Sequence, residues 1–456
     1  MGHYRGSAAA GVRGPSHCSD PRSGHVARWS GAAIRTAMNS ELEIVVIADD
    51  LTGAADAGVQ FCSVVGTIYL TGPDVPELSG NGRITAGLAV FTNTRHMAAA
   101  EAGKIAGNVA MKIRSLQPRM VYKKIDSCLR GNIGPETEAL ILAMGYKASF
   151  VAPAFPQQGR ITVDDLHQIN GVPVAETEIG RDPLCPVRES RLSVLLSGQC
   201  RLPVGHVDLA SVEKGPDTLV PKVQTLLKSG CRHIAFDASR QEHLNTVANL
   251  ARHHFNGILL VGSAGLAAGL AGSMGVKAVH AAPSFRPKLK KPLFICGSAS
   301  RVLAAQREVL VRHTGFPEMA LDPELLSLPE AICRRSQLAE NLAATWLEGG
   351  LVLCIAPFSP TSSVAVPDRV IQGFAEVAAS LIRLSSPDGV FLSGGDTAES
   401  VCKRIGAEAI RLIEEVLPGL MRGKLIGGRH DGLSVVTKAG AFGPPQTLVQ
   451  LLMILS

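Results

Sequence analysis

Short β-branched segments alternate with alanine- and leucine-rich segments of helical period along most of this chain. The first series runs through EIVVIA, TIYLTG, AGLAVFT, MVYKKI, SFVAPAF, HIAFDA and GILLVGS. A second series follows through FICGSAS, GLVLCIA and GVFLSGG. Such alternation is typical of βαβ units around a parallel sheet. It predicts an α/β fold whose sites lie at the carboxyl ends of the strands.

The alternation is interrupted once, by a proline- and lysine-bearing stretch without helical period, VKAVHAAPSFRPKLKKP. We place an interdomain linker there, over residues 273–291. The 456 residues are enough for two domains. We therefore expect one domain over residues 41–272 and a second over residues 292–456, each with a largely parallel sheet flanked by helices.

The first 40 residues differ from the rest in composition and charge. They are rich in Gly, Ser, Ala, Arg and His, and they lack the continuous apolar region of a secretory signal. Most of the net charge of +6 comes from their arginines, so the remaining chain offers no basic surface for nucleic acid. We expect residues 1–40 to be a disordered extension or an over-long start, with a transit peptide as the alternative.

Composition narrows the class of protein further. Aromatic residues make up only 4% of a chain with 47 glycines, a balance typical of α/β enzymes. The ten cysteines form no C-x-x-C pair, which favours reduced thiols in a cytoplasmic protein over a disulfide framework or a zinc site. No apolar run reaches the roughly 18 residues that a membrane span needs. We predict a cytoplasmic enzyme without nucleic-acid or membrane partners.

The segment KKIDSCLRGN, which follows an apolar strand, gathers groups able to bind an anion or a hydroxyl. Lys124 and Arg130 are candidate binders of a carboxylate or phosphate, and Asp126 is a candidate base with Ser127 beside it. The alternative is a salt-bridged loop ahead of a helix that begins near Pro135. That alternative leaves Asp126 beside Lys124 unexplained.

Three further turns in the first half follow strands. The turn ADDLTG carries Asp50 and opens an alanine-rich helix, whose N-terminus would favour an anion. Alternatively, Asp50 and Asp56 could simply cap that helix. Arg95 ends TNTR and could bind a carboxylate through two parallel hydrogen bonds, or it could be a surface residue. Arg160 ends APAFPQQGR, which could equally be a plain proline-rich loop.

Glycine-rich turns join strand to helix in the second half, and their backbone amides could approach phosphates. They lie in FICGSAS, LSGGDTA and TKAGAFG. Neither the P-loop nor the G-x-G-x-x-G fingerprint is present, and H-E-x-x-H and G-x-S-x-G are absent as well. The candidate phosphate-binding residues are Ser298, Gly394, Gly395, Asp396, Thr397 and Gly440.

Together, IADDLTGAADAG, TNTR, KKIDSCLRGN, VAPAFPQQGR, FICGSAS, LSGGDTA and TKAGAFG resemble the motifs of the four-carbon acid sugar kinase family, in the same order. The resemblance implies an N-terminal sugar-acid domain and a C-terminal ATP domain, with the active site in the cleft between them. Cys128 stands where the family usually has Thr, and Ile161 where Thr is frequent. The stretch RDPLCPVRES is more similar to threonate and erythronate kinases than to the 3-oxo-tetronate branch.

The resemblance implies transfer of the ATP γ-phosphoryl group to the terminal hydroxyl of D-threonate or D-erythronate, with Mg²⁺ as cofactor. Either Asp126 or Asp50 would accept the hydroxyl proton, and we favour Asp126. The metal ligands are left open, and a homodimer is allowed for. The alternatives are a 3-oxo-tetronate kinase and a non-catalytic protein that binds small acids. The residues implied to contact the substrate are Asp50, Arg95, Lys124, Asp126, Ser127, Arg130 and Arg160.

Overall fold

The computed structural model describes residues 42–74, 86–182, 184–275, 289–357, 367–440 and 442–455. The extension expected at residues 1–40 lies outside these ranges, as does most of the predicted linker. Within these ranges, no helix is both long and apolar enough to cross a membrane.

The first half of the chain contributes a run of parallel strands to the main sheet, in the order β2-β3-β1-β4-β11-β5-β10-β9. Helices cover both faces of such a sheet, so its strands read as continuous apolar runs; six of the seven residues of β1 are buried. The strands are β1 (Leu42–Ala48), β2 (Ile68–Thr71), β3 (Ala86–Phe91), β4 (Val121–Lys124), β5 (Ala148–Ala152), β9 (Val204–Val207), β10 (His233–Phe236) and β11 (Ile258–Gly262).

Several helices of this half show the expected one-sided burial. In α4 the buried residues recur three or four positions apart, from Ala102 through Ala106 and Val109 to Ile113, which places them on the face toward the sheet. The helices are α2 (Leu51–Val59), α3 (Cys62–Val65), α4 (Ala99–Ser115), α5 (Ile133–Met144), α6 (Leu192–Gln199), α7 (Leu209–Glu213), α8 (Pro216–Lys228), α9 (Gln241–His254) and α10 (Ala264–Met274).

The second half adds parallel strands in the order β13-β14-β12-β15-β18, followed by the antiparallel pair β17 and β16. These strands are β12 (Pro292–Cys296), β13 (Glu318–Leu321), β14 (Leu351–Ile355), β15 (Gly389–Ser393), β16 (Ala409–Leu417), β17 (Leu420–Ile426) and β18 (Ser434–Lys438). The helices are α11 (Arg301–Thr314), α12 (Pro323–Ser327), α13 (Ile332–Thr345), α14 (Pro367–Ser385), α15 (Gly395–Arg404) and α16 (Thr447–Leu455).

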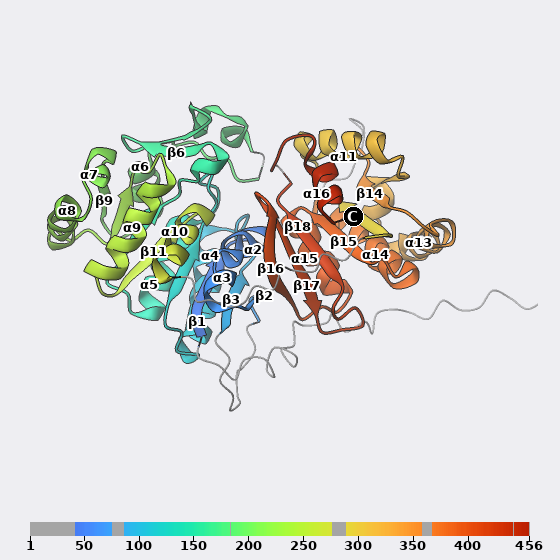
Figure 1. Ribbon diagram of the computed structural model, residues 1–456, viewed down its shortest axis with the longest axis horizontal. Coiled ribbons are helices and arrows are strands. Elements are labelled where there is room, and N and C mark those ends of the chain that lie inside the picture. Colours follow the sequence, from blue (N-terminus) through green and yellow to red (C-terminus); the bar gives the residue numbers. More distant parts are fainter. Residues whose placement is uncertain are drawn as a thin grey trace, which may run out of the picture.

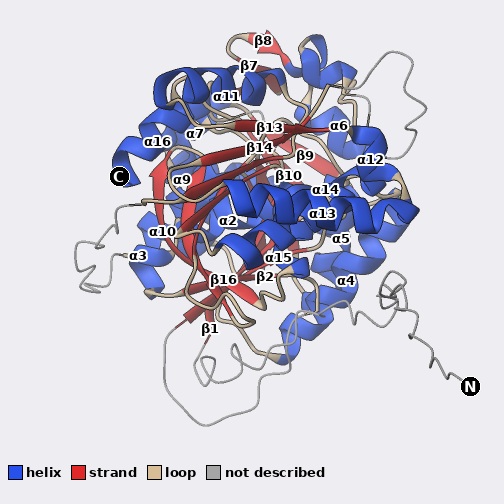
Figure 2. Ribbon diagram, turned by 90° about the vertical axis from the view of Figure 1, so that its right-hand side faces the viewer, coloured by secondary structure: helices blue, strands red, loops and turns tan. Residues whose placement is uncertain are grey.

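The two groups of strands join into one 15-stranded sheet. The join is an antiparallel pairing of β16 with β2, in which Leu412 lies opposite Ile68 and Ile410 opposite Leu70. Figure 1 shows β16 and β2 meeting between the two halves, and Figure 2 shows the helices packed around the strands. The α/β class with largely parallel strands is confirmed, whereas the hairpin that fuses the two sheets was not anticipated.

The strand register brings the predicted motifs to common edges. In the first half Ala48 pairs with both Phe91 and Lys124, so the turns after β1, β3 and β4 lie side by side. In the second half Ser393 pairs with Cys296 and Lys438, which aligns the glycine-rich turns after β12, β15 and β18. Each half therefore presents its polar turns at one edge of its own strands.

A small antiparallel sheet follows β5, where the sequence suggested a proline-rich loop. After a single 3₁₀ turn at Pro156–Gln158, the strands β6 (Arg160–Val163), β7 (Leu166–Ile169) and β8 (Val172–Pro173) form a meander. The expected proline-rich loop is therefore limited to the turn at Pro156–Gln158, and the residues after it form strands. Arg160 begins β6, and its side chain is therefore held by a strand.

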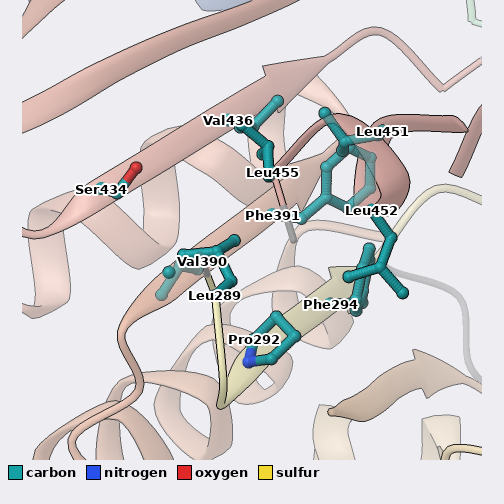
Figure 3. Close-up of a pocket in the computed structure, with 11 residues that line it drawn as sticks. Leu289, Pro292, Phe294, Val390, Phe391, Ser434, Val436, Leu451, Leu452 and Leu455 are labelled. Atoms are coloured by element: carbon teal, nitrogen blue, oxygen red, sulfur yellow. The ribbon is translucent and has the colours of Figure 1, made fainter. Parts of the chain in front are cut away.

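A separate apolar cluster lies under the C-terminal helix α16. It packs Leu448, Leu451 and Leu455 against β12, β15 and β18. Figure 3 shows the cavity within it, whose walls are almost wholly hydrocarbon, with the Ser434 hydroxyl as the side-chain oxygen among the residues drawn. This cavity has no charged group that could bind a phosphate or a sugar acid.

Candidate active site

The turn after β1 carries two adjacent aspartates that bind one arginine. Asp50 caps α2, where its carboxylate accepts hydrogen bonds from the Gly53 amide (2.9 Å) and the Thr52 hydroxyl (2.6 Å). Arg95, after β3, donates from Nε and Nη2 to Asp49 at 2.8 and 2.9 Å. It also donates from Nη1 and Nη2 to Asp50 at 3.0 and 2.8 Å. Asp50 is therefore both a helix cap and part of this ionic cluster.

The cluster changes what Arg95 can do. Most donors of its guanidinium are taken by the two aspartates. Burial alone would raise the pKa of Asp49, but Arg95, with help from Lys123 and Lys124, holds that pKa below its usual value. The sequence suggested Arg95 as a ligand for a substrate carboxylate. In this geometry its charge is already neutralised, and its main effect is to order the acidic turn.

Lys123 and Lys124 end β4 and point to opposite faces of the sheet. Lys123 is buried in an ion pair with Glu136 of α5, with Nζ 2.7 Å from Oε2. Lys124 lines a cavity, and its Nζ donates to the Ile125 carbonyl at 2.8 Å. No carboxylate in the described ranges lies within ion-pair distance of Lys124. Among the cations that line this cavity, Lys124 is therefore the one best able to accept an anionic ligand.

Asp126 and Arg130, both expected in the site, bind each other. Arg130 Nε donates to Asp126 Oδ2 at 2.7 Å, and its Nη1 reaches Asp182 at 3.3 Å. Burial acts to raise the pKa of Asp126, but Arg130 and Arg95 lower it well below its usual range. Asp182 belongs to the RDPLCPVRES stretch, and Cys185 of that stretch accepts a hydrogen bond from the Gly131 amide at 3.0 Å. The stretch thus touches the KKIDSCLRGN loop directly.

Ser127 and Arg160 link this loop to the second half of the chain. Arg160 Nη1 donates to Ser127 Oγ at 2.9 Å, and the guanidinium lies 4.6 Å from the centre of the Phe442 ring. Such a cation–π contact contributes about 0.5–2 kcal/mol, depending on burial. The neighbouring His167 donates from Nε2 to the Ser127 carbonyl at 2.8 Å, and its Nδ1 lies 2.9 Å from the Thr162 hydroxyl. Burial lowers the pKa of His167 to about 4. The ring is thus a neutral, structural group.

The glycine-rich turns of the second half pack closely on one another. A Cβ added at Gly440 would lie 2.1 Å from Ser298 Oγ, and one at Gly297 would lie 2.2 Å from Thr397 Oγ1. Gly394 has φ +102°, a conformation that side-chain-bearing residues rarely adopt. The expected phosphate-binding residues therefore form one compact surface around the N-terminus of α15. Asp396, in the first turn of α15, is exposed.

This surface faces the acidic turn of the first half. A Cβ at Gly395 would lie 3.4 Å from Asp50 Oδ2 and 3.7 Å from Thr52 Oγ1. The N-termini of α2 and α15 thus approach each other, and both favour negative charge. A cavity lies at this junction, lined by residues of both halves: Asp50, Thr52, Gly53, Asp56, Arg95, Lys124, Asp126, Ser127, Arg130, Gly419, Met421, Ala439 and Phe442.

Asp56 is the residue in this cavity that the sequence reasoning assigned only as a helix cap. Its Oδ1 is buried and has no hydrogen-bond partner within the described ranges. Burial raises the pKa of Asp56 to about 7; Lys124 opposes the rise and Glu415 adds to it. One signal was available: Asp56 is a carboxylate in LTGAADAGV, an otherwise uncharged helix. All nine residues of that helix are buried.

Oxygen donors suited to Mg²⁺ occur where the two halves meet. The carboxylates of Asp50 and Asp396 flank the Gly394–Gly395 turn, and Mg²⁺ in phosphoryl-transfer sites is usually bound by one or two carboxylates together with phosphate oxygens. The donor set therefore fits a nucleotide-bound Mg²⁺.

Comparison with known proteins assigns the two halves of the chain to two domain families. Residues 44–270 match the model of a sugar-binding N-terminal domain, and residues 293–448 match that of a nucleotide-binding C-terminal domain. The D-threonate kinase of Salmonella typhimurium is 31% identical over 427 residues, covering 90% of this chain and 98% of the relative. This chain belongs to the four-carbon acid sugar kinase family.

Other members of the family are similar over the same span. The D-erythronate kinase of Heliobacterium modesticaldum is 29% identical, covering 88% of this chain and 94% of the relative. The 3-oxo-tetronate kinase of Brucella melitensis is 26% identical, covering 88% and 93%.

Two solved structures share the fold. One, from Salmonella typhimurium LT2, has a TM-score of 0.73 at 23% identity and covers 91% of this chain and 99% of its own. The other, from Haemophilus influenzae, has a TM-score of 0.67 at 23% identity and covers 90% of this chain and 100% of its own. The α/β architecture described above is thus the architecture of solved proteins.

Proposed function

We propose that this protein is an ATP-dependent kinase that phosphorylates the terminal hydroxyl of a four-carbon sugar acid, D-threonate or D-erythronate. The observation that carries the proposal is the approach of Gly395 to Asp50 beside a cavity lined by both halves. One wall holds hydroxyl- and carboxylate-binding groups, and the other holds glycine amides suited to phosphates. A kinase needs these two surfaces in contact, because the nucleophile and the γ-phosphoryl group must meet in line.

On the first wall, Lys124 would bind the substrate carboxylate, because it is the cavity cation without a carboxylate partner in the described ranges. Ser127 and Asp126 would hydrogen-bond substrate hydroxyl groups. Arg95 and Arg130 would hold Asp50 and Asp126 in place, and Arg160 would position Ser127. The side chains on this wall would thus fix the sugar acid before transfer.

On the second wall, the turns of Ser298, Gly394, Gly395, Thr397 and Gly440 would bind the ATP phosphates through backbone amides and hydroxyls. Mg²⁺, when bound, supplies charge neutralisation of the transferring phosphoryl group. Asp50 and Asp396 are the residues placed to hold it. The close packing of Gly440 on Ser298 leaves no room for a side chain at residue 440.

Three carboxylates of the cavity could accept the hydroxyl proton, and we assign this role to Asp56. Asp126, favoured on sequence grounds, is held by Arg130 and has a lowered pKa, which makes it a weak base. Asp50 is engaged by Arg95, Thr52 and Gly53. Asp56 has an unpartnered oxygen and a pKa of about 7, near the value that suits a general base at neutral pH.

Contacts of the RDPLCPVRES stretch support the choice of substrate. Its Asp182 binds Arg130, and its Cys185 binds the Gly131 amide, so differences in this stretch reach the cavity through the KKIDSCLRGN loop. A stretch similar to that of threonate and erythronate kinases therefore favours those acids over 3-oxo-tetronate.

The test is ADP release measured with a panel of three- to six-carbon sugar acids, including both threonate and erythronate enantiomers and a 3-oxo-tetronate. We expect ATP- and Mg²⁺-dependent turnover with a four-carbon aldonate and much less with shorter or longer acids. The phosphorylated product, analysed by phosphorus–proton correlation NMR, should carry phosphate on the terminal carbon.

Three outcomes would contradict the proposal. Turnover confined to the 3-oxo acid would favour that branch of the family. A rise in melting temperature with sugar acids but not with Mg²⁺-ATP, and no ADP release, would indicate a binding protein. Turnover of an alcohol outside the four-carbon class would refute the substrate assignment.

The domain boundaries at residues 41–272 and 292–456, the cytoplasmic location and a homodimer remain predictions. Limited proteolysis would test the boundaries, because cleavage should concentrate in the linker predicted at residues 273–291. Analytical ultracentrifugation would test the oligomeric state.

A further inference from the structure

A second cluster of reactive side chains lies in the first half of the chain, away from the cavity. Glu138 of α5, Cys200 at the end of α6 and His233 at the start of β10 bring their ligand atoms within 4.8 Å of one another. His233 is the first residue of its strand, so the cluster lies at the amino ends of the parallel strands. The candidate active site lies at the carboxyl ends. The kinase reaction described above therefore makes no use of these three residues.

The separation of two of these groups fits a shared ion better than a direct contact. His233 Nε2 lies 3.6 Å from Glu138 Oε1, which is beyond the usual range of an N–H···O hydrogen bond. Ligand atoms about 2.0 Å from a tetrahedral Zn²⁺ are about 3.3 Å apart, close to the observed value. The Cys200 sulfur lies within 4.8 Å of both other ligand atoms, so that a rotation of its side chain would complete three ligands and leave a fourth position for water.

The partners of His233 favour one orientation of its ring. Its Nδ1 lies 2.8 Å from Ser149 Oγ, whereas Nε2 is buried and has no hydrogen-bond partner within the described ranges. The imidazole is fully buried, so water cannot easily satisfy Nε2. Metal-bound histidines commonly donate the other ring N–H to a neighbouring oxygen, as Nδ1 could here to Ser149.

The other two ligands are held in place by the backbone. Glu138 Oε1 accepts hydrogen bonds from the amides of Arg201 and Leu202 at 2.6 and 2.7 Å. The Cys200 amide in turn donates to the Leu196 carbonyl at 2.7 Å. These bonds fix the segment that carries the thiol against the carboxylate, so little ordering would be needed to bind an ion.

We propose that Glu138, Cys200 and His233 form a structural site for a borderline-soft divalent transition-metal ion of the Zn²⁺ class. One thiolate, one imidazole and one carboxylate are ligands that Zn²⁺ accepts, while Mg²⁺ and Ca²⁺ prefer oxygen alone. Binding converts the Cys200 thiol to a thiolate, and its proton leaves to solvent. The ligands come from three distant segments, which is why the spacing of cysteines along the chain pointed away from a zinc site.

The test uses Co²⁺ as a spectroscopic probe of the full-length protein after treatment with a chelator. One equivalent of Co²⁺ should produce two signals. The first is a thiolate-to-cobalt charge-transfer band in the near ultraviolet, and the second is the set of visible absorption bands typical of four-coordinate Co²⁺. Cys200→Ser should abolish the charge-transfer band and lower Zn²⁺ affinity, measured by competition with a chelator, by at least about tenfold. Ser149→Ala should keep the band but weaken binding about tenfold, since it removes the partner of Nδ1.

Cys231→Ser is the matched control, because this half-buried thiol lies two residues before His233 and outside the cluster. It should leave both the band and the affinity unchanged. Far-ultraviolet circular dichroism of each variant would confirm that it is folded. No charge-transfer band in the folded wild-type protein, or a band that persists in Cys200→Ser, would overturn the proposal. A band that Mg²⁺-ATP displaces would place the cobalt in the cavity and would overturn it as well.

Discussion

Gly395 lies so close to Asp50 that a methyl group at residue 395 would contact the Asp50 carboxylate at 3.4 Å. Gly395 belongs to the nucleotide-binding domain, and Asp50 belongs to the sugar-binding domain. Each occupies a turn between a strand and a helix. This close approach brings together the two surfaces that the proposed phosphoryl transfer would require.

Gly395→Val should weaken nucleotide binding by at least about tenfold while leaving the fold intact. The β-branched side chain would fill the space between the turn and Asp50 and would block the approach of a phosphate to the backbone amides. Calorimetric titration with a non-hydrolysable ATP analogue measures the effect. Gly395→Ala is the control, since its Cβ makes only an ordinary contact. Equal affinities of Gly395→Val and the wild type would remove this turn from the nucleotide site.

Asp56→Asn should lower kcat by about 100-fold or more with little change in KM for the sugar acid, because the amide cannot accept the hydroxyl proton. With an Asp56 pKa of about 7, wild-type activity should fall as the pH drops below 7, since protonation removes the base. The remaining activity of Asp56→Asn should lack this dependence. Stopped-time ADP assays across pH 5–9 would measure both effects.

Asp126→Asn and Asp50→Asn are the matched controls for this assignment. Both should mainly raise KM, because they disturb ion pairs that position the substrate-binding loops. A collapse of kcat in Asp126→Asn, with near-normal turnover in Asp56→Asn, would return the role of base to Asp126.

Asp56 should also affect stability in a pH-dependent way. Its pKa is raised by burial, so the folded protein binds a proton more tightly than the unfolded chain does, and stability is lost as the pH rises from about 4 to about 7. Asp56→Asn should remove this loss. Its melting temperature should exceed that of the wild type above pH 7 and approach it near pH 4. Calorimetry of both proteins near pH 4 and above pH 7 measures this difference in melting temperature.

Arg95→Ala should destabilise the protein by about 3–5 kcal/mol at neutral pH, because it leaves Asp49 and Asp50 without their shared cation. The pKa of Asp49 is lowered in the folded protein, so its contribution is present above the unfolded pKa and is lost as the pH falls through the folded value. The deficit of the variant should therefore shrink toward pH 4, where its carboxylates can be protonated. Urea unfolding at several pH values measures it. A deficit that does not vary with pH would refute this account.

Lys123→Met should lower the free energy of unfolding by about 3–5 kcal/mol, because the Glu136 carboxylate would be left buried and unpaired. The double variant Lys123→Met/Glu136→Gln should recover most of this loss. In the wild type the Thr94 hydroxyl donates to the Glu136 carboxylate at 2.8 Å, and the amide oxygen of Gln at residue 136 can accept the same hydrogen bond. Urea unfolding of the two variants and the wild type gives the comparison. If the double variant is less stable than the single one, the unpaired charge is not the cause.

The sequence alone determined the α/β class, because the alternation of buried strands and one-sided helices is local and repeats many times. It also indicated several of the turns that line the cavity, since each polar cluster directly follows an apolar strand. Membership of the four-carbon acid sugar kinase family rested on motifs in sequence order, and the family matches confirm it.

Tertiary structure decided which charges are available. Lys123 and Lys124 are adjacent and identical in the sequence, but Lys123 is paired with Glu136 whereas Lys124 faces the cavity. The sequence does not show this difference, because Glu136 lies on another element. Arg95 and Asp126 were both expected to contact the substrate, and the structure binds each of them to another charged side chain of the protein.

The same holds for the long-range arrangement of the chain. The antiparallel pairing of β16 with β2 and the burial of Asp56 depend on residues more than 300 positions apart. The Glu138–Cys200–His233 cluster likewise gathers three distant segments. Local sequence patterns report the periodicity of each element. The free energy of a buried charge depends instead on which groups the folded chain brings beside it, and that only the tertiary structure decides.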